Sequence, residues 1–95
     1  MKLKLSEQVA GFVRGLAPEP RREMRLAFRR LAKGQGDVKA LEGALASYWR
    51  LRVGSYRVIV FYRSPDEVEC IYAERRSIVY EIFAEALRER LVGNP

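Results

Sequence analysis

The pattern of apolar and polar positions predicts helices at both ends of the chain and strands between them. Residues 1–5 alternate polar and apolar side chains, as a short edge strand does. Ser6 can cap the helix that follows, whose apolar positions recur at helical spacing: Val9, Phe12, Val13 and Leu16. A second helix begins near two prolines and repeats this pattern with Met24, Ala27, Phe28 and Leu31. We expect these two helices to form an antiparallel hairpin.

Period-two alternation predicts three strands, at about 47–53, 56–63 and 67–73, with residues 38–47 as a connector. If Gly54-Ser55 is the loop of the first hairpin, Arg52 lies directly opposite Arg57. Like charges in that position are unfavourable by up to ~1 kcal/mol. The predicted hairpin therefore holds a repulsive pair that needs an explanation.

The same alternation assigns the side chains of the hairpin to two faces. One face carries Trp49, Leu51, Val53, Val58 and Val60, which should pack on the helices. The opposite face carries Tyr48, Arg50, Arg52, Arg57, Ile59, Phe61 and Arg63. A third helix covers 77–91, with Ile78, Ile82 and Leu87 among its buried candidates. This order of elements predicts one α+β domain over residues 1–95.

Composition limits the possible chemistry. The chain has 95 residues, no histidine and one cysteine, Cys70, which we expect to be an inert buried thiol. A zinc site or a histidine base is therefore not expected, and neither is any other metal or a cofactor. No apolar run is long enough to span a membrane, so we expect a soluble, cytoplasmic protein. The net charge of +6 indicates a polyanionic or acidic partner, or else a solvated basic surface.

Residues 43–65 contain four arginines and no acidic residue. Guanidinium groups that converge without a counter-ion are suited to phosphate, because the planar fork donates two parallel hydrogen bonds to an oxyanion. A phosphodiester or an acidic partner segment between Arg52 and Arg57 would explain the repulsive pair. Alternatively, both side chains point into water, where salt screens the repulsion. Arg75, Arg76 and Tyr80 follow the third strand, and a tyrosine near arginines can stack on a base or transfer a proton.

Three stretches, "VKALEG", "YWRLRVGSYRVIVFY" and "ERRSIVYEIF", together resemble the RelE/ParE superfamily of bacterial toxins. The resemblance implies a small fold in which an N-terminal helical hairpin and a C-terminal helix pack on a curved antiparallel sheet. It also implies a cognate antitoxin. RelE-type members cut mRNA on the ribosome, with the ribose 2′-hydroxyl as nucleophile and a cyclic phosphate as product.

Matched by position, the resemblance implies a catalytic role for Arg57, Arg75 and Tyr80, with Arg76 nearly equivalent to Arg75. It implies RNA-backbone contacts for Arg50, Arg52, Arg76 and Lys39. Arginine replaces the usual lysine at positions 50 and 52, and it cannot act as a base near neutral pH. The histidine or glutamate base of other nuclease branches is also missing, which leaves Tyr80 as the base candidate.

Two alternatives to a ribosome-dependent endoribonuclease stay open. ParE-type members share the fold but inhibit DNA gyrase without nuclease activity. A third reading is a non-toxic protein-binding member, in which the basic face only binds an acidic antitoxin segment.

Overall fold

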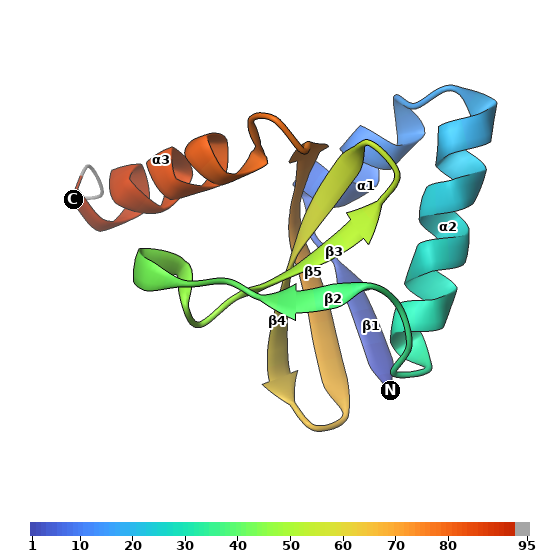
Figure 1. Cartoon of the computed structure of the whole chain (residues 1–95), viewed down its shortest axis with the longest axis horizontal. Helices are drawn as coiled ribbons and strands as arrows, with labels where there is room; N and C mark the ends of the chain where they lie inside the picture. Colours follow the sequence, from blue (N-terminus) through green and yellow to red (C-terminus); the bar gives the residue numbers. More distant parts are fainter. Residues whose placement is uncertain (93–95) are drawn as a thin grey trace.

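The computed structural model describes the backbone of residues 1–92 and the side chains of residues 1–89, arranged as a five-stranded sheet with helices on both faces (Figure 1). In chain order the elements are β1 (Lys2–Leu5), α1 (Glu7–Arg14), α2 (Pro18–Ala32), β2 (Val38–Ala40), a 3₁₀ turn (Gly43–Leu45), β3 (Trp49–Val53), β4 (Tyr56–Ser64), β5 (Glu67–Arg75) and α3 (Val79–Val92). The α+β class and the order of helices and strands are therefore confirmed.

The strand order is β1-β5-β4-β3-β2, so the predicted edge strand at the N-terminus lies at one edge. The strands β2 to β5 are antiparallel to their neighbours, as expected, whereas β1 runs parallel to β5, so the sheet as a whole is mixed. A tight hairpin would force two strands to be antiparallel, but most of the chain separates β1 from β5. Ser6 follows β1 and caps α1 as predicted, accepting a hydrogen bond from the Val9 amide at 3.1 Å.

The predicted hairpin register is confirmed. Leu51 pairs with Val58, and Arg52 pairs directly with Arg57. Gly54 has a φ of 56°, and a positive φ at the first loop position is what a type II′ turn requires. The two arginines of the repulsive pair are thus true cross-strand neighbours.

Residues 38–47 are more than a connector. Val38–Ala40 form β2, which pairs antiparallel with β3, and Lys39 lies opposite Arg50. A strand of three residues is too short for an alternation signal to stand out, and its partner strand supplies the register. The missed strand adds a fourth basic position beside the predicted arginines.

The main core lies between one face of the sheet and the two N-terminal helices. Leu51 and Val58 are buried there against Met24 and Phe28 of α2. Gln8 of α1 also exchanges two 2.8 Å hydrogen bonds with the backbone of Ala73. The prediction that this face packs on the helices is confirmed except at its end: Trp49 is 38% exposed and contacts Tyr62 edge to face.

The opposite face carries a smaller cluster under the start of α3. Its buried members are Ile59 of β4 and Val79 and Phe83 of α3. The expectation that Ile78 and Ile82 are buried was therefore wrong: both are only partly buried, and the residue that follows each of them is buried instead. Leu87 packs against this cluster and is partly buried. An irregularity in the β4–β5 pairing brings both Ile71 and Tyr72 to this face. None of the described helices is long and apolar enough to span a lipid bilayer.

Candidate functional site

Three neighbouring strands bring basic side chains together on the face of the sheet that carries α3. Arg52 pairs with Arg57, and Lys39 pairs with Arg50, so the four positions form two adjacent rows. Directly opposed residues have Cβ atoms about 5 Å apart. We call Lys39, Arg50, Arg52, Arg57, Arg76 and Tyr80 the sheet-face cluster.

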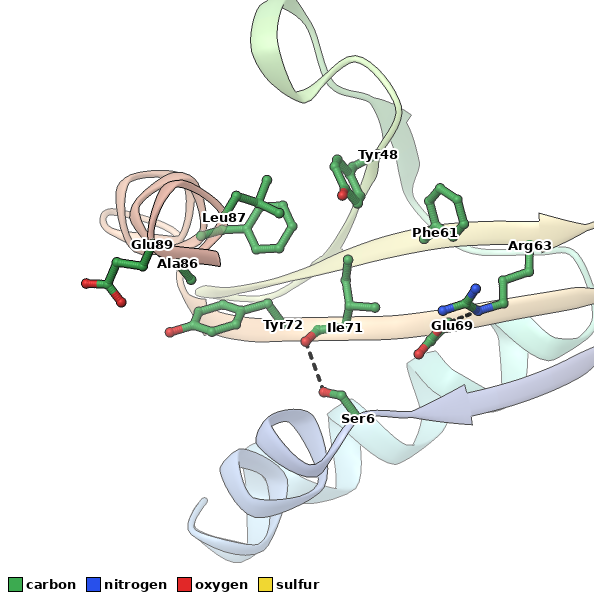
Figure 2. A pocket seen from close by; sticks show the side chains of 11 residues that line it. Ser6, Tyr48, Phe61, Arg63, Glu69, Ile71, Tyr72, Ala86, Leu87 and Glu89 are labelled. Atoms are coloured by element: carbon green, nitrogen blue, oxygen red, sulfur yellow. Dashed lines mark hydrogen bonds and ion pairs between the residues drawn. The ribbon is translucent and has the colours of Figure 1, made fainter. Parts of the chain in front are cut away.

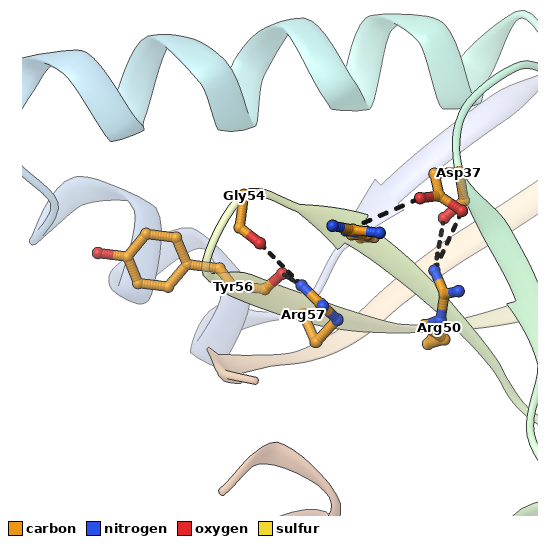
Figure 3. A network of polar contacts seen from close by, with 6 residues as sticks. Asp37, Arg50, Gly54, Tyr56 and Arg57 are labelled. Atoms are coloured by element: carbon orange, nitrogen blue, oxygen red, sulfur yellow. Dashed lines mark hydrogen bonds and ion pairs between the residues drawn. The ribbon is translucent and has the colours of Figure 1, made fainter. Parts of the chain in front are cut away.

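Among the described residues Arg57 forms no ion pair with a carboxylate, a property that it shares with Lys39 and Arg76 of this cluster. Its Nη1 atom donates hydrogen bonds to the backbone carbonyls of Gly54 (2.9 Å) and Tyr56 (2.8 Å), which hold the half-buried guanidinium beside the turn (Figure 3). Burial lowers the pKa of Arg57, and the charge of Arg52 lowers this pKa further. The remaining donors of Arg57 are thus held in place with unneutralised charge, which suits an anionic ligand.

Arg50 and Arg52 are not free of counter-ions, so the expectation of an uncompensated cluster was wrong for both. Asp37 lies just before β2, outside the window in which the sequence shows no acid. Its carboxylate is 3.2 Å from Arg50 Nη1 and 4.0 Å from Arg52 Nε, and its backbone carbonyl also accepts from Arg50 at 3.2 Å (Figure 3). One carboxylate therefore bridges both arginines of β3, at a solvent-accessible position.

Arg63, the fourth arginine of the window, lies at the far end of β4 and belongs to another environment. It pairs with Glu69 at 2.5 Å and lies 4.0 Å from Glu67. Its guanidinium carbon also lies 5.7 Å from the centre of the Phe61 ring. Arg63 therefore pairs with carboxylates of β5, and we do not count it among the residues that could bind phosphate.

The two arginines after β5 take different positions. Arg75 pairs with Tyr56 across β4–β5, and pleat alternation places it on the face that carries α1 and α2. Arg76 donates its amide to the carbonyl of Ser55 at 2.9 Å, and its positive charge also lowers the pKa of Arg57. The structure thus brings Arg76, and not Arg75, into the sheet-face cluster.

Tyr80 lies in the first turn of α3 and is partly buried against the small cluster around Ile59. It is close enough to Arg57 for its charge to raise the pKa of that guanidinium, against the effects of burial and Arg52. α3 therefore brings Tyr80 into electrostatic range of Arg57.

Sequence reasoning missed two acidic residues that shape this site. Asp37 was hidden because β2 was not predicted. Glu74 pairs directly with Arg57 on the β5 side, although its carboxylate accepts a hydrogen bond from the Arg75 amide at 3.0 Å and forms no ion pair with Arg57. Only the register of β4 with β5 could have revealed Glu74, because turn length does not fix that register when the strands contain bulges.

Cys70 is fully buried in the main core, as predicted. Burial raises the pKa of its thiol to about 12, and the nearby Glu69 adds to this effect. The thiol is therefore protonated and shielded near neutral pH, and is unsuited to nucleophilic chemistry. In the part of the chain that the structure describes, no group of three or more His, Cys, Asp or Glu side chains is arranged to hold a metal ion.

A groove of about 990 Å³ lies next to the cluster, between α3 and the outer parts of β4 and β5 (Figure 2). Its walls carry polar and apolar surface in about equal parts: apolar and aromatic side chains include Tyr48, Phe61, Ile71, Tyr72, Phe83 and Leu87, and the Arg63–Glu69 pair lies at one end. None of the sheet-face cluster lines this groove. The molecule thus has a charged patch and a groove with aromatic walls on the same face.

No protein-family model and no curated protein matches this sequence. Solved structures do match. The chain is similar to the toxin in the RelB-RelE antitoxin-toxin complex of Methanococcus jannaschii, with a TM-score of 0.66, 18% identity, and coverage of 84% of this chain and 98% of that one. This is the fold of the RelE/ParE superfamily toxins.

Two further RelE/ParE-type structures agree with this fold. A chain of the archaeal RelE-RelB complex from Pyrococcus horikoshii OT3 shares 25% sequence identity with this chain, with a TM-score of 0.61 and coverage of 79% of this chain and 93% of that one. The YoeB/ParE toxin from Agrobacterium tumefaciens is 22% identical, with a TM-score of 0.57 and coverage of 80% and 99%. The sequence resemblance is therefore confirmed in the fold, and it extends over most of the chain.

Proposed function

We propose that this protein is the toxin of a toxin–antitoxin pair and that it cleaves mRNA on the ribosome. The observation that carries the proposal is Arg57: in a RelE/ParE-type fold, this partly exposed residue has its guanidinium fixed by two carbonyls near other cations, and it forms no ion pair among the described residues. Such fixed positive charge stabilises the extra negative charge that a phosphate gains in its transition state, which is often the largest contribution to catalysis.

The proposed reaction is intramolecular in the RNA. The ribose 2′-oxygen attacks the adjacent phosphorus, the bond from phosphorus to the 5′-oxygen breaks, and a 2′,3′-cyclic phosphate remains. The 2′-hydroxyl loses a proton, and the 5′-oxygen gains one. Arg57 would bind the non-bridging oxygens, and Tyr80 is the proposed proton acceptor, because arginine holds its proton too tightly to act as a base.

The remaining members would hold the RNA backbone on either side of this phosphate. Lys39 and Arg50 form the row next to Arg52 and Arg57, so they would contact a neighbouring phosphate. We place Arg76 near the reacting group in the role that the sequence resemblance gave first to Arg75, because Arg76 acts electrostatically on Arg57. Substrate binding would compete with Asp37 for Arg50 and Arg52.

Brief induction followed by primer-extension mapping of transcripts tests the reaction. We expect cuts at defined positions inside translated codons, and we expect both the cuts and the growth arrest to disappear in Arg57→Ala and Tyr80→Phe. Arg63→Ala is the matched control, because it removes an arginine from the same strand and leaves the cluster intact. Full toxicity of both cluster variants would reject the proposal.

The partner is proposed to be an antitoxin, because neighbouring structures of this fold were solved as toxin–antitoxin complexes. The groove beside α3, with its aromatic and aliphatic walls, would offer the surface for one of its segments. We expect Leu87→Glu to weaken co-purification with the antitoxin while Arg57→Ala leaves it unchanged. An unaltered complex with Leu87→Glu would exclude the groove as the contact.

A ParE-type gyrase inhibitor is the second candidate, and Asp37 is the observation that favours it. A carboxylate that neutralises Arg50 and Arg52 reduces the charge available to RNA. Loss of plasmid supercoiling before translation fails, after induction, would select this function.

A further inference from the structure

Ser55 is an exposed residue that has no part in the core or in the proposed reaction. It is the second residue of the two-residue loop between β3 and β4, and Gly54 beside it is exposed as well. Exposed loop tips are the places where other enzymes reach a folded chain most easily. The Ser55 hydroxyl is therefore a candidate for chemical modification.

The sheet-face cluster surrounds this loop with positive charge. Arg57 Nη1 donates to the carbonyls of Gly54 at 2.9 Å and Tyr56 at 2.8 Å (Figure 3). These are the carbonyls on either side of that of Ser55, so the guanidinium lies against the loop. The Ser55 carbonyl itself accepts a 2.9 Å hydrogen bond from the amide of Arg76. One fixed guanidinium and the backbone of a second arginine thus flank Ser55.

The residues before Ser55 carry arginines at a regular spacing. Arg50 and Arg52 lie five and three residues before it on β3, and residues 43–65 contain no acidic residue. Pleat alternation places both arginines on one face of the strand. Protein kinases choose their substrates partly by such charge patterns, and one class selects arginine three residues before the acceptor. The spacing fits a serine kinase of this basophilic class.

The other serines of the chain lack this combination. Ser6 caps α1, and Ser47 follows ten residues that contain no arginine. Ser64 precedes two acidic residues, and its hydroxyl accepts from the amide two residues later at 3.3 Å. Ser77 follows two arginines, but a glutamate lies three residues before it and another lies four residues after it. Ser55 is therefore distinguished both by its sequence and by its surroundings.

Two carboxylates come near the loop without neutralising its arginine. The Oε2 atom of Glu23 on α2 is 3.3 Å from the position that a Cβ at Gly54 would occupy. Glu74 pairs with Arg57 across β4 and β5, but its carboxylate accepts from a backbone amide of β5. Neither carboxylate forms an ion pair with Arg57 among the described residues. The remaining donors of Arg57 are thus available to an anion on Ser55.

We propose that Ser55 is a phosphorylation site whose phosphate switches the sheet-face cluster off. The inference deepens the proposed function by naming a regulation of the same site, and it rests on that function for its effect on RNA. The Ser55 oxygen attacks the γ-phosphorus of a nucleoside triphosphate bound to a serine kinase. The bond from that phosphorus to the bridging oxygen breaks, the nucleoside diphosphate leaves, and the hydroxyl proton passes to a base of the kinase.

The phosphate would bind the groups that the substrate needs. A phosphoserine carries almost two negative charges near neutral pH and three acceptor oxygens. On Ser55 these oxygens would accept from the remaining donors of Arg57 and pair with Arg52 or Arg76. The phosphate would then occupy the place proposed for the scissile phosphate of the RNA. It would also remove the repulsion between Arg52 and Arg57, so the modified hairpin should be both more stable and inactive.

Incorporation of phosphoserine at position 55 of the full chain, followed by a ³¹P NMR titration, tests the contact with the arginines. We expect the second pKa of this phosphate to lie about one pH unit below its usual value of about 6, because nearby cations favour the dianion. Arg57→Gln should reverse most of this change. Phosphoserine at position 64 is the matched control, because that exposed residue ends the same strand beside acidic residues. Equal pKa values at the two positions would overturn the proposal.

A purified basophilic serine kinase with ATP tests whether the folded chain presents Ser55. We expect mass spectrometry to find phosphate on Ser55 before Ser64 and Ser77, and we expect slower transfer to Ser55 in Arg52→Gln. Preferential transfer to Ser77 would overturn the proposal. Transfer to Ser55 only after the chain is unfolded would overturn it as well.

RNA assays keep this proposal apart from the nuclease. We expect phosphate on Ser55 to weaken binding of single-stranded RNA about tenfold and to reduce cleavage at least as much, whereas Ser55→Ala keeps both near the wild type. A wild-type protein that cuts no mRNA, but whose phosphate on Ser55 shows the lowered pKa, would reject the nuclease and retain the modification site. A protein that cuts mRNA through Arg57 equally well with and without this phosphate would do the reverse.

Discussion

The two faces of the sheet are built by the same strands and serve different ends. The face under α1 and α2 forms a cluster with twelve buried residues among those described, including Leu51 and Val58. The face under α3 has three buried residues among those described in its cluster, and beside them lie charged side chains and the groove. Adjacent residues of β3 and β4 therefore belong to different environments: Leu51 is buried between Arg50 and Arg52, and Val58 is buried beside Arg57.

This difference shows how so small a chain combines stability with a charged site. One face supplies most of the burial of apolar area that drives folding. The other face can then tolerate an unfavourable pair such as Arg52–Arg57, which costs at most ~1 kcal/mol. Substitutions of neighbouring residues should consequently separate stability from activity.

The largest expected effect is on stability, at Leu51. Leu51→Ala leaves a cavity in the main core, where the side chain is 1% exposed, and should lower the free energy of unfolding by ~2–5 kcal/mol. Thermal unfolding should show a melting temperature lower by roughly 10 °C or more. Arg52→Ala is the control on the opposite face and should change stability by less than ~1 kcal/mol. Similar losses in both variants would mean that the two faces are not energetically distinct.

Arg57→Gln should produce the next largest effect, and on activity alone. Removal of one fixed donor to a transition-state oxyanion typically lowers the rate ~10²–10³-fold. Cleavage of a translated message in a purified system measures this loss, and the melting temperature should stay within a few degrees of the wild type. Val58→Ala, at the neighbouring position on the core face, should show the opposite pattern, and retention of cleavage by Arg57→Gln would contradict the assignment.

The buried thiol of Cys70 should make the free energy of unfolding depend on pH in the alkaline range. The pKa of Cys70 is raised to about 12, so between the unfolded value of 9.0 and this value the unfolded chain binds fewer protons than the folded one. The contribution of Cys70 is complete below pH 9 and falls as the pH rises, by up to about 1.4 kcal/mol per unit. Denaturant unfolding from pH 8 to pH 11 should show a shallower decline in Cys70→Ala than in the wild type; parallel curves would refute the burial effect.

The smallest expected effect is on RNA affinity and concerns Asp37, whose carboxylate pairs with two arginines of the charged face. Asp37→Asn removes the carboxylate that bridges Arg50 and Arg52. We expect single-stranded RNA to bind about threefold more tightly, with a salt slope steeper by about one, because phosphate no longer competes with the carboxylate. Asp66→Asn, in the exposed turn before β5, is the charge-matched control. Weaker binding in Asp37→Asn would mean that Asp37 positions the arginines and does not mask them.

Local pattern was enough to predict most elements and much of the site. Helical spacing located α1 and α2, the Ser6 cap was read from one residue, and the Gly54-Ser55 loop fixed the pairing of Arg52 with Arg57. Strand alternation failed to predict the exposure of Trp49, because the helices do not extend over that end of the sheet. Helical spacing failed for α3, where the buried residues are Val79 and Phe83 and not Ile78 and Ile82.

The sequence by itself determined most of the strands and helices, with the exception of β2, and which side chains of β3 and β4 share a face, because these depend on contacts between near neighbours in the chain. Only the tertiary structure decided that Asp37 reaches Arg50, that Glu74 lies opposite Arg57, and that Arg76 enters the cluster in place of Arg75. These relations depend on how β2 and β5 dock beside β3 and β4. Such docking is settled by burial and register across the whole sheet, and no single stretch of sequence contains that information.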